Sequence, residues 1–522
     1  MSDVPTTHEG SRAQDPDRRR RRLLRLRRSR LLLLRRLAYV VGAVVAAVGV
    51  AMLPAALVSA IYREWGDALA ICGAALIAVA SGLAAWRLIG QKGRITTREG
   101  FAAVGLSWIV MSLFGTLPYL LTGSITNLTD AFFETAAGFT TTGSSIVPDP
   151  GALSHGILIW RAGTQWLGGM GVIVLSIAIL PLLGVGGVEL ARAESPGPQP
   201  DRLTPRFRET AQRLWWVYVG LTVIEALLLM AGDMTPLQAV AHAFTTMSTG
   251  GFGTEADSLA GFSAYTQWVV IAFMFLAGAS FALHFRALRD PKAYGRSGEF
   301  RLYATLTLIA IGLVVVGLFD TGIGRNLGEV GTEETLRSAT FTTVSLMTTT
   351  GYATADFGAW VSGLQIMAVG LMFVGGMAGS TAGSVKTYRI GVLARSSLAD
   401  LRRFIHPRGV FVARFDGHAV PTSVVRNVQS FFLFYMFLFM TGVFLLGVIE
   451  SRQLAELDLV TSASAVASAL GNIGPGLGEV GPTSNYLGLP ALGKWLLSGL
   501  MIAGRLEIFP VLLLLTPDLW KR

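Results

Sequence analysis

The stretch from Phe341 to Ala355, FTTVSLMTTTGYATA, carries residue types that could bind a cation without an acidic side chain. It is a short apolar run that ends in three threonines, Gly351 and Tyr352. Hydroxyl residues beside a glycine let backbone carbonyls face a passing ion, because glycine adopts backbone angles that a side chain forbids. Taken alone, the pattern fits a polar loop between two helices equally well.

The same pattern occurs four times along the chain. The other copies are DAFFETAAGFTTTGSS at 130–145, AVAHAFTTMSTGGFGT at 239–254 and TSASAVASALGNIGPG at 461–476. Each is an amphipathic run of roughly 12 residues that ends at a glycine. We align Gly143, Gly250, Gly351 and Gly474 as the equivalent positions. A repeat of roughly 110 residues can hold one hydrophobic helix, one re-entrant segment and a second hydrophobic helix.

The composition places these motifs in a membrane. Of the 522 residues, 52% are hydrophobic and 15% are charged, whereas a soluble domain carries about a quarter charged residues. Apolar runs long enough to cross a bilayer lie near 38–61, 67–89, 101–121, 157–185, 214–231, 266–285, 302–319, 362–394, 425–448 and 491–515. We therefore predict an all-α polytopic membrane protein with four tandem helix, pore-loop, helix repeats around one pore, preceded by an extra two-helix hairpin.

The predicted segments divide the chain as follows: a basic tail at 1–36, two extra transmembrane helices at 37–95, and pore repeats at 96–192, 193–292, 293–415 and 416–522. The tail is too basic and too long for the start of a signal peptide. Nucleic-acid binding is one interpretation of its arginines. A cytoplasmic anchor on anionic membrane lipids is favoured, because a hydrophobic span follows at once.

Basic residues also predict the orientation. The segments between repeats are rich in Lys and Arg, whereas the opposite loops are acidic and hold all four glycine motifs. The positive-inside rule puts the basic segments and both termini in the cytoplasm. Capping patterns predict the starts of two re-entrant helices. One is Thr235-Pro236, and the other is Thr332 followed by Glu333 and Glu334. Their negative C-terminal ends would then point toward the pore axis.

The stretch GGMAGSTAGS, from Gly375 to Ser384, interrupts an apolar span. Lipid cannot satisfy the backbone of a broken helix, so the segment is expected to line a pore or a cavity walled by protein. Close packing of a helix through small residues is the alternative. Counting about 12 residues to the end of the last span puts Arg505 about 18 Å deep, which makes it a functional candidate or half of an ion pair with Glu225. Lys386 is expected at the inner membrane interface.

These motifs resemble those of Trk-type potassium uptake subunits, the TrkH branch of the superfamily that also holds the KtrB and HKT transporters. The resemblance covers the chain from about residue 38 onward and rests on GFTTTGSS (138–145), the long run from Trp160 to Gly187, RAESPGP (192–198), AHAFTTMSTGGF (241–252), LMTTTGYAT (346–354), GGMAGSTAGSVKTYRI (375–390), ALGNIGPG (469–476) and GRLEIFP (504–510).

The resemblance implies a potassium filter made by Thr141, Thr142 and Gly143, by Ser248, Thr249 and Gly250 with Gly251 following, by Thr349, Thr350 and Gly351, and by Asn472, Ile473 and Gly474. It implies a gate that includes Gly375, Gly376, Gly379, Ser380, Thr381, Gly383, Ser384, Lys386 and Arg505. It also implies a homodimer in the prokaryotic plasma (inner) membrane, a cytosolic TrkA-type nucleotide-binding regulatory ring, and potassium as the transported ion with no cofactor.

The fourth filter segment departs from the pattern. Asn472 and Ile473 replace hydroxyl residues, and Pro475 restricts the backbone of the preceding glycine. We therefore expect modest selectivity over sodium.

Three other functions were weighed. Sodium or non-selective cation transport within the superfamily is the main rival. An alternating-access secondary transporter would need inverted repeats, whereas these share one orientation. An enzyme is not expected, because there is no HExxH motif and GLPALGKW (488–495) lacks the hydroxyl of a phosphate loop.

Overall fold

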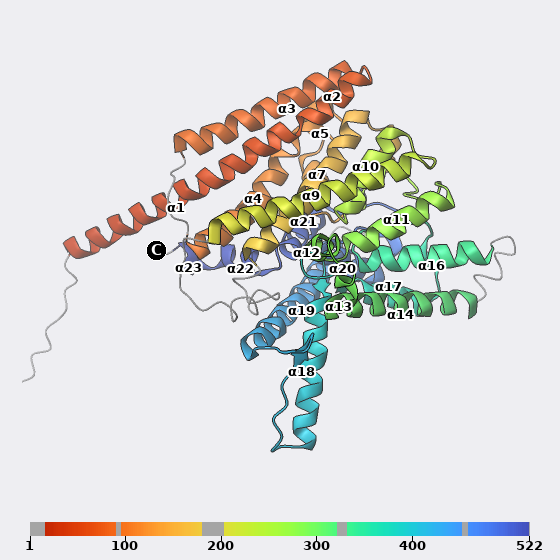
Figure 1. The fold of residues 1–522 in the computed structure, drawn as a ribbon. Helices are drawn as coiled ribbons and strands as arrows, with labels where there is room; N and C mark the ends of the chain where they lie inside the picture. Colours follow the sequence, from red (N-terminus) through yellow and green to blue (C-terminus); the bar gives the residue numbers. More distant parts are fainter. Residues whose placement is uncertain (1–15, 90–95, 180–202, 321–330, 452–457, 521–522) are drawn as a thin grey trace, which may run out of the picture.

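The computed structural model describes residues 16–89, 96–179, 203–320, 331–451 and 458–520 (Figure 1). The segment 180–202, which holds RAESPGP, the end of the apolar run 157–185 and one predicted domain boundary, lies outside the described residues, as does the start of the basic tail. The described chain is mostly helical, and two pairs of two-residue strands are its exceptions to the predicted all-α class.

The N-terminal helices form a hairpin. It consists of α1 (Pro16–Ala51), α2 (Leu53–Ile61), α3 (Trp65–Ala84) and a π-helical turn, η1 (Ala85–Ile89). Helices α1 and α3 lie side by side along most of their length (Figure 1). Small residues allow this approach: a Cβ added to Gly82 would lie 2.5 Å from the backbone nitrogen of Ala46.

Four groups of helices follow, and each contains one short helix of 12 to 16 residues that is shorter than the group's first helix and ends just before a glycine segment. The first group is α4 (Thr97–Phe114), α5 (Leu117–Thr122), the short α6 (Leu128–Phe139), the turn η2 (Pro150–Ala152) and α7 (His155–Ile179). The second is α9 (Leu203–Met230), the short α10 (Pro236–Met247), α11 (Ala264–Ala277), α12 (Phe281–Ala287) and α13 (Ala293–Arg296). The third is α14 (Gly298–Asp320), the short α16 (Thr332–Met347), the turn η4 (Phe357–Ala359), α17 (Ser362–Leu371) and α18 (Thr387–Ile405). The fourth is α19 (Thr422–Ser451), the short α20 (Leu459–Gly471), the turn η5 (Gly478–Val480), α21 (Ala491–Arg505), α22 (Phe509–Leu515) and α23 (Pro517–Trp520).

The predicted N-terminus is confirmed for α10 but not for α16. Thr235 caps α10 and forms a capping box with Gln238, with Pro236 in the first turn. The prediction for α16 was wrong by one residue, because Gly331 is its N-cap and makes no side-chain bond. Glu333 and Glu334 do lie in its first turn, where acidic side chains interact well with the helix dipole.

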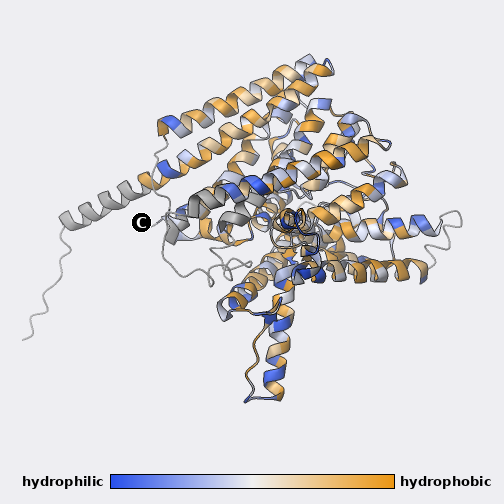
Figure 2. Cartoon of the chain, viewed as in Figure 1, coloured by the Kyte–Doolittle hydropathy of each residue, from blue (hydrophilic) through white to orange (hydrophobic). Residues whose placement is uncertain are grey.

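Six described helices are long and apolar enough to cross a membrane, or seven if one bent pair is counted as a span. Hydrophobic residues predominate along these helices (Figure 2), and some of them are exposed: Leu69, for example, is 73% exposed. Large exposed apolar side chains on long helices are expected where lipid is the solvent. The protein is an integral membrane protein.

Two spans that the sequence predicted as continuous are broken. The run 266–285 bends by 101° between α11 and α12, at Gly278–Ser280. The run 491–515 is interrupted between α21 and α22, where Glu507 and Ile508 have φ values of 56° and 68°. Hydropathy does not detect such breaks, because the residues around them remain apolar. The depth of Arg505 was counted along one straight helix, and the break after Arg505 removes the basis of that count.

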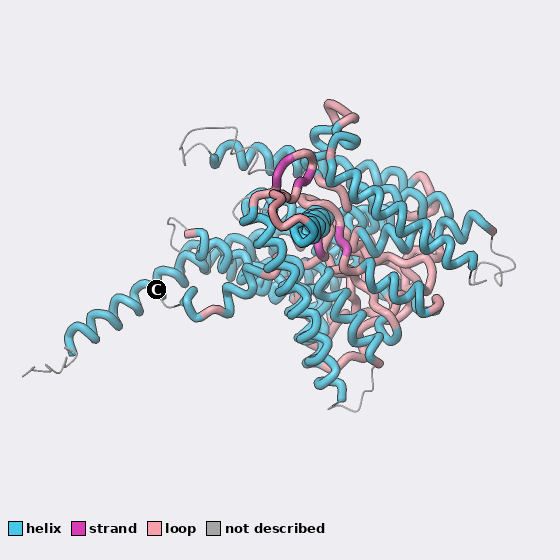
Figure 3. Tube along the Cα trace, turned by 90° about the horizontal axis from the view of Figure 1, so that it is seen from below, coloured by secondary structure: helices cyan, strands magenta, loops and turns pink. Residues whose placement is uncertain are grey.

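The strands are local features (Figure 3). Strands β1 (Val374–Gly375) and β2 (Val385–Lys386) pair in parallel and close the base of the glycine-rich segment. Strands β3 (Arg414–Phe415) and β4 (His418–Ala419) form an antiparallel pair in the connection after α18. Helix α18 itself extends away from the rest of the helices (Figure 1).

Candidate ion-conduction site

The four short helices end in the same way. A left-handed residue follows each of them within two positions: Thr141 (φ 52°), Thr249 (φ 55°), Thr349 (φ 58°) and Asn472 (φ 56°). Two residues later comes a glycine that also has a positive φ: Gly143 (81°), Gly251 (78°), Gly351 (80°) and Gly474 (117°). Positive φ is costly for residues other than glycine and Asn, so its recurrence at four threonine or asparagine positions indicates a conformation imposed by the packing.

The sequence alignment was wrong by one residue in the second segment, because Gly251 is the equivalent of Gly143. The residue between the turn and the glycine donates its backbone N–H to a carbonyl five residues earlier in all four segments: Thr142 to Ala137, Gly250 to Thr245, Thr350 to Ser345 and Ile473 to Ser468. Ser248 is the right-handed C-cap of α10, as Thr140 is of α6. The two adjacent glycines, Gly250 and Gly251, made the sequence alignment ambiguous.

The four segments touch one another in cyclic order. A Cβ added to Gly143 would overlap the carbonyl oxygen of Gly250, one on Gly251 would overlap that of Thr350, and one on Gly351 would overlap that of Ile473. The circle closes where a Cβ on Gly474 would lie 2.9 Å from the carbonyl oxygen of Thr142. The four glycines line a common pocket of about 110 Å³. A side chain at any of these four positions would therefore clash with the carbonyl oxygen of a neighbouring segment.

Polar side chains from α6 and α7 hold the first two segments. Arg161 and Glu134 form a fully buried ion pair at 2.9 Å. Glu134 also accepts the backbone N–H of Ile146, and Arg161 donates to the carbonyl of Gly253. Gln165 donates to the carbonyl of Gly250 at 2.8 Å. Sequence reasoning did not select these residues, although two charges inside apolar runs were a usable signal.

The fourth segment is linked to the first by Asn472. Its side-chain amide donates to the hydroxyl of Thr142 at 2.9 Å and to the carbonyl of Met501 in α21 at 2.8 Å. The residue that departs from the sequence pattern thus keeps the shared left-handed conformation, which asparagine tolerates well.

The segment Gly375–Ser384 lies against the ends of several of these elements. The Thr381 hydroxyl donates to the carbonyls of Met247 and Ala277, at the ends of α10 and α11. The backbone N–H of Gly383 donates to the Thr349 hydroxyl at 2.6 Å, and a Cβ on Gly383 would overlap the carbonyl of Gly471. The segment is not helical, which removes the alternative of a small-residue helix.

Arg505 is the last residue of α21 and is only 3% exposed. Its guanidinium donates to the carbonyl of Thr381 at 2.6 Å and to that of Gly168 in α7 at 3.3 Å. The ion pair with Glu225 that the sequence left open does not form. Glu225 is buried in α9, and neither of its oxygens has a hydrogen-bond partner among the described residues.

Other charged groups surround the same segment. Lys386 is 7% exposed and donates to the carbonyl of Ala382, so its side chain is buried in the fold, whereas a residue that anchors at a membrane interface would be exposed. The Glu299 carboxylate accepts the backbone N–H of Ala378 at 2.6 Å. Glu507 pairs with Arg389 at 2.5 Å. The parallel pairing of β1 with β2 turns Lys386 into the fold, and hydropathy alone could not show this.

The described residues contain no group of three or more His, Cys, Asp or Glu side chains that could hold a metal ion. Backbone carbonyls and hydroxyls are thus the cation ligands that the described part of the chain offers where its four segments meet.

The comparison with known proteins agrees with this geometry. The family model TrkH, described as a cation transport protein, matches residues 67–521. The chain belongs to the TrkH family. Its relatives in the family include the Trk system potassium uptake protein TrkH of Halomonas elongata, 40% identical over 434 residues that cover 82% of this chain and 87% of the relative. TrkH of Vibrio parahaemolyticus is 36% identical and covers 92% of this chain and 98% of the relative.

TrkH of Escherichia coli K12 is 37% identical over 93% of this chain and 99% of its own length. The fold matches the crystal structure of the potassium transporter TrkH from Vibrio parahaemolyticus with a TM-score of 0.83 and 34% sequence identity, covering 93% of this chain and 99% of that one. Membership of the TrkH family identifies the chain as a cation transporter rather than an enzyme.

Proposed function

We propose that this member of the TrkH family takes up potassium through a pore whose filter is formed by the four segments that follow α6, α10, α16 and α20. The observation that carries the proposal is the cyclic contact of these segments, with a neighbouring carbonyl against every glycine. Carbonyl rings replace the hydration shell of a dehydrated ion in cation filters. The relatives named potassium uptake proteins support potassium as the ion.

The filter proposed here consists of residues 141–143, 249–251, 349–351 and 472–474. Ser248 is left out, because it ends α10. The carbonyl ends of the four short helices precede these segments, and their partial negative charge favours a cation nearby. Four helix, pore-loop, helix repeats around one pore are therefore the architecture that we propose.

The gate in this proposal is the segment Gly375–Ser384 together with Arg505 and Lys386. The segment contacts the ends of α10, α11 and α20 and the Thr349 hydroxyl, so an ion leaving the filter would meet it. Arg505 holds Thr381 and brings a positive charge to the same place. A conformational change of the segment would have to break these bonds before ions could pass.

The remaining parts of the proposal concern the assembly. The relatives are named as parts of a Trk system, which supports a cytosolic partner, and we propose a TrkA-type nucleotide-binding ring. We also propose a homodimer in the prokaryotic inner membrane. The distribution of basic residues supports only the cytoplasmic position of both termini.

Uptake of radioactive rubidium and sodium into proteoliposomes tests the proposal. The full chain should take up rubidium, potassium should compete with it, and Gly351→Val should abolish uptake while the protein remains folded. A Cβ at Gly351 overlaps the Ile473 carbonyl, so this variant must displace the proposed filter. Sodium uptake equal to that of rubidium would favour the non-selective alternative. Uptake by Gly351→Val at the wild-type rate would remove the filter assignment.

A further inference from the structure

The carbonyl oxygen of Gly474 differs from those of the other three glycines. It accepts hydrogen bonds from the hydroxyls of Ser144 (2.9 Å), Ser468 (2.7 Å) and Tyr486 (2.8 Å). In the described part of the chain, the carbonyls of the other glycines, Gly143, Gly251 and Gly351, accept none. The φ of Gly474 is 117°, whereas the other three lie between 78° and 81°. The backbone of the fourth segment is therefore rotated at its glycine, whereas the other three segments share one conformation there.

Three donors occupy this carbonyl fully. A carbonyl oxygen has two lone pairs, so three hydroxyl donors leave none directed at a passing ion. The oxygen could bind a cation only after giving up at least one of these bonds. Of the four glycine carbonyls, three are consequently free of hydrogen bonds in the described part of the chain, and the fourth is not.

The sequence explains why the fourth segment is rotated. The Ser468 hydroxyl accepts the backbone N–H of Gly474 at 2.9 Å and donates to the carbonyl of the same residue. The equivalent residue of the third segment, Ser345, donates instead to the carbonyl of Tyr352, one residue beyond the glycine. Pro475 follows Gly474 and has no N–H, so it cannot supply the backbone bonds that an ordinary residue would.

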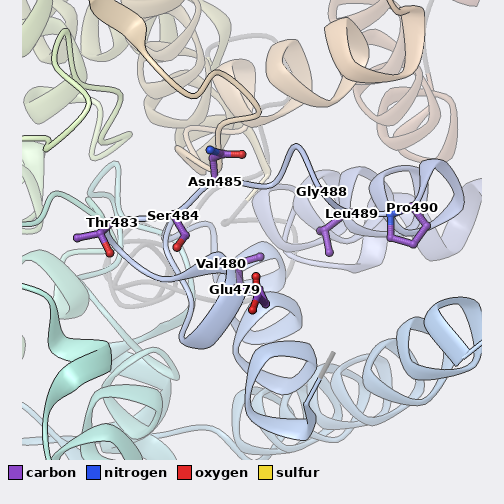
Figure 4. Close-up of a pocket in the computed structure, with 8 residues that line it drawn as sticks. All are labelled: Glu479, Val480, Thr483, Ser484, Asn485, Gly488, Leu489 and Pro490. Carbon is purple, nitrogen blue, oxygen red and sulfur yellow. The ribbon is translucent and has the colours of Figure 1, made fainter. Parts of the chain in front are cut away.

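Tyr486 comes from the loop after the fourth segment and is 2% exposed. Its backbone N–H donates to the carbonyl of Ser145, which ties this loop to the first segment. Figure 4 shows neighbouring residues of the loop around a pocket of about 390 Å³, lined by Glu479, Val480, Thr483, Ser484, Asn485, Gly488, Leu489 and Pro490. Tyr486 thus bridges two segments, through its backbone N–H to the first and through its hydroxyl to the fourth.

We propose that Ser144, Ser468 and Tyr486 withdraw the Gly474 carbonyl from the ring and thereby lower the preference of the pore for potassium over sodium. The inference rests on the proposed filter. The number of carbonyls around the ion is one of the quantities that set this preference, and a larger ion such as potassium accommodates more of them. Ser144, Ser468 and Tyr486 are positioning residues, because each acts through the Gly474 carbonyl.

Two substitutions release the carbonyl with little change in volume: Tyr486→Phe and Ser144→Ala. Ser468 is kept, because its hydroxyl also accepts the N–H of Gly474. The full chain is reconstituted in proteoliposomes, and rubidium and sodium uptake are measured side by side. We expect the ratio of rubidium to sodium uptake to rise at least threefold in the double variant and less in each single one.

The matched control is Tyr119→Phe, which removes a buried hydroxyl that has no hydrogen-bond partner among the described residues. Its uptake ratio should equal that of the wild type. A double variant with the wild-type melting temperature and an unchanged or lower ratio would overturn the inference. If the wild-type chain takes up neither ion, the proposed function itself fails, which is a separate outcome.

A structural measurement covers the case in which the double variant does not fold. Anomalous diffraction from wild-type crystals grown in rubidium should show the ion at the glycine level bound by the carbonyls of Gly143, Gly251 and Gly351. An ion at bonding distance from the Gly474 carbonyl would contradict the inference.

Discussion

Replacing Arg505 with alanine should increase cation flux. The side chain makes two hydrogen bonds to backbone carbonyls, at 2.6 Å to Thr381 and at 3.3 Å to Gly168. Hydrogen bonds to charged groups contribute about 1.5–3 kcal/mol each, and the longer bond belongs at the low end. Removing both should therefore weaken the hold on the segment Gly375–Ser384 by about 3 kcal/mol or more.

The charge adds a second effect. A guanidinium that a cation must pass at about 4 Å repels it by about 1 kcal/mol at the dielectric constant of water and by about 4 kcal/mol at an effective value of 20. Because about 1.4 kcal/mol corresponds to a tenfold change, even the smaller figure slows passage about fivefold. The expected increase in flux for Arg505→Ala is therefore at least several-fold.

The assay is rubidium uptake into proteoliposomes by protein that elutes as one species and melts like the wild type. Arg505→Lys is the matched control, since it keeps the charge but cannot reach both carbonyls with one planar fork. Its flux should lie between those of the wild type and Arg505→Ala. Glu225→Gln should leave both the flux and the effect of Arg505→Ala unchanged, because Glu225 forms no ion pair with Arg505. A well-folded Arg505→Ala protein with wild-type or lower flux would refute the barrier.

Three further predictions concern the filter, its support and the partner. Gly143→Ser should shift uptake toward sodium, because its Cβ overlaps the Gly250 carbonyl at a φ of 81°; an unchanged rubidium-to-sodium ratio would count against the filter assignment. Glu134→Gln should lower the free energy of unfolding by about 3–5 kcal/mol, because it leaves the buried Arg161 without its counter-charge. Thermal melting in detergent measures the loss, and Glu209→Gln, which removes an exposed carboxylate from α9, is the control. The purified chain alone should show no nucleotide-dependent flux, because its sequence has no nucleotide-binding motif, and a nucleotide response without a partner would overturn the proposed division of roles.

The sequence predicted the membrane class and the positions of the four glycine segments, because each depends on local composition and repetition. The family was predicted from the resemblance of its motifs. Hydropathy located Trp65–Ile89 and Gly298–Asp320 as spans, since nothing interrupts their apolar runs. It missed the break after Arg505, where two positive φ values turn the chain without any change in polarity. The assumption of one straight helix behind the counted depth of Arg505 failed for that reason.

Contacts between distant residues could not be predicted from one sequence. Glu134 and Arg161 are 27 positions apart, and the Thr381–Arg505 bond joins residues 124 positions apart. The alignment of the second segment with the other three was wrong for a different reason. Two consecutive glycines satisfy the same pattern, and only the backbone hydrogen bonds show that Gly251 takes the position of Gly143.

A single chain that carries four related segments can give each of them a different environment. The first two segments are held by Glu134, Arg161 and Gln165, and no equivalent of this cluster is present at the third and fourth among the described residues. The glycine-rich segment occurs once, after α17, and contacts three of the four short helices or their segments through Met247, Thr349 and Gly471. In an assembly of four identical subunits every such feature would occur four times, and four loops or four arginines would compete for one axis. Encoding the segments in one chain would allow the proposed gate to consist of one loop and one arginine. In that proposal, a single conformational change in the third group of helices would be enough to open the pathway.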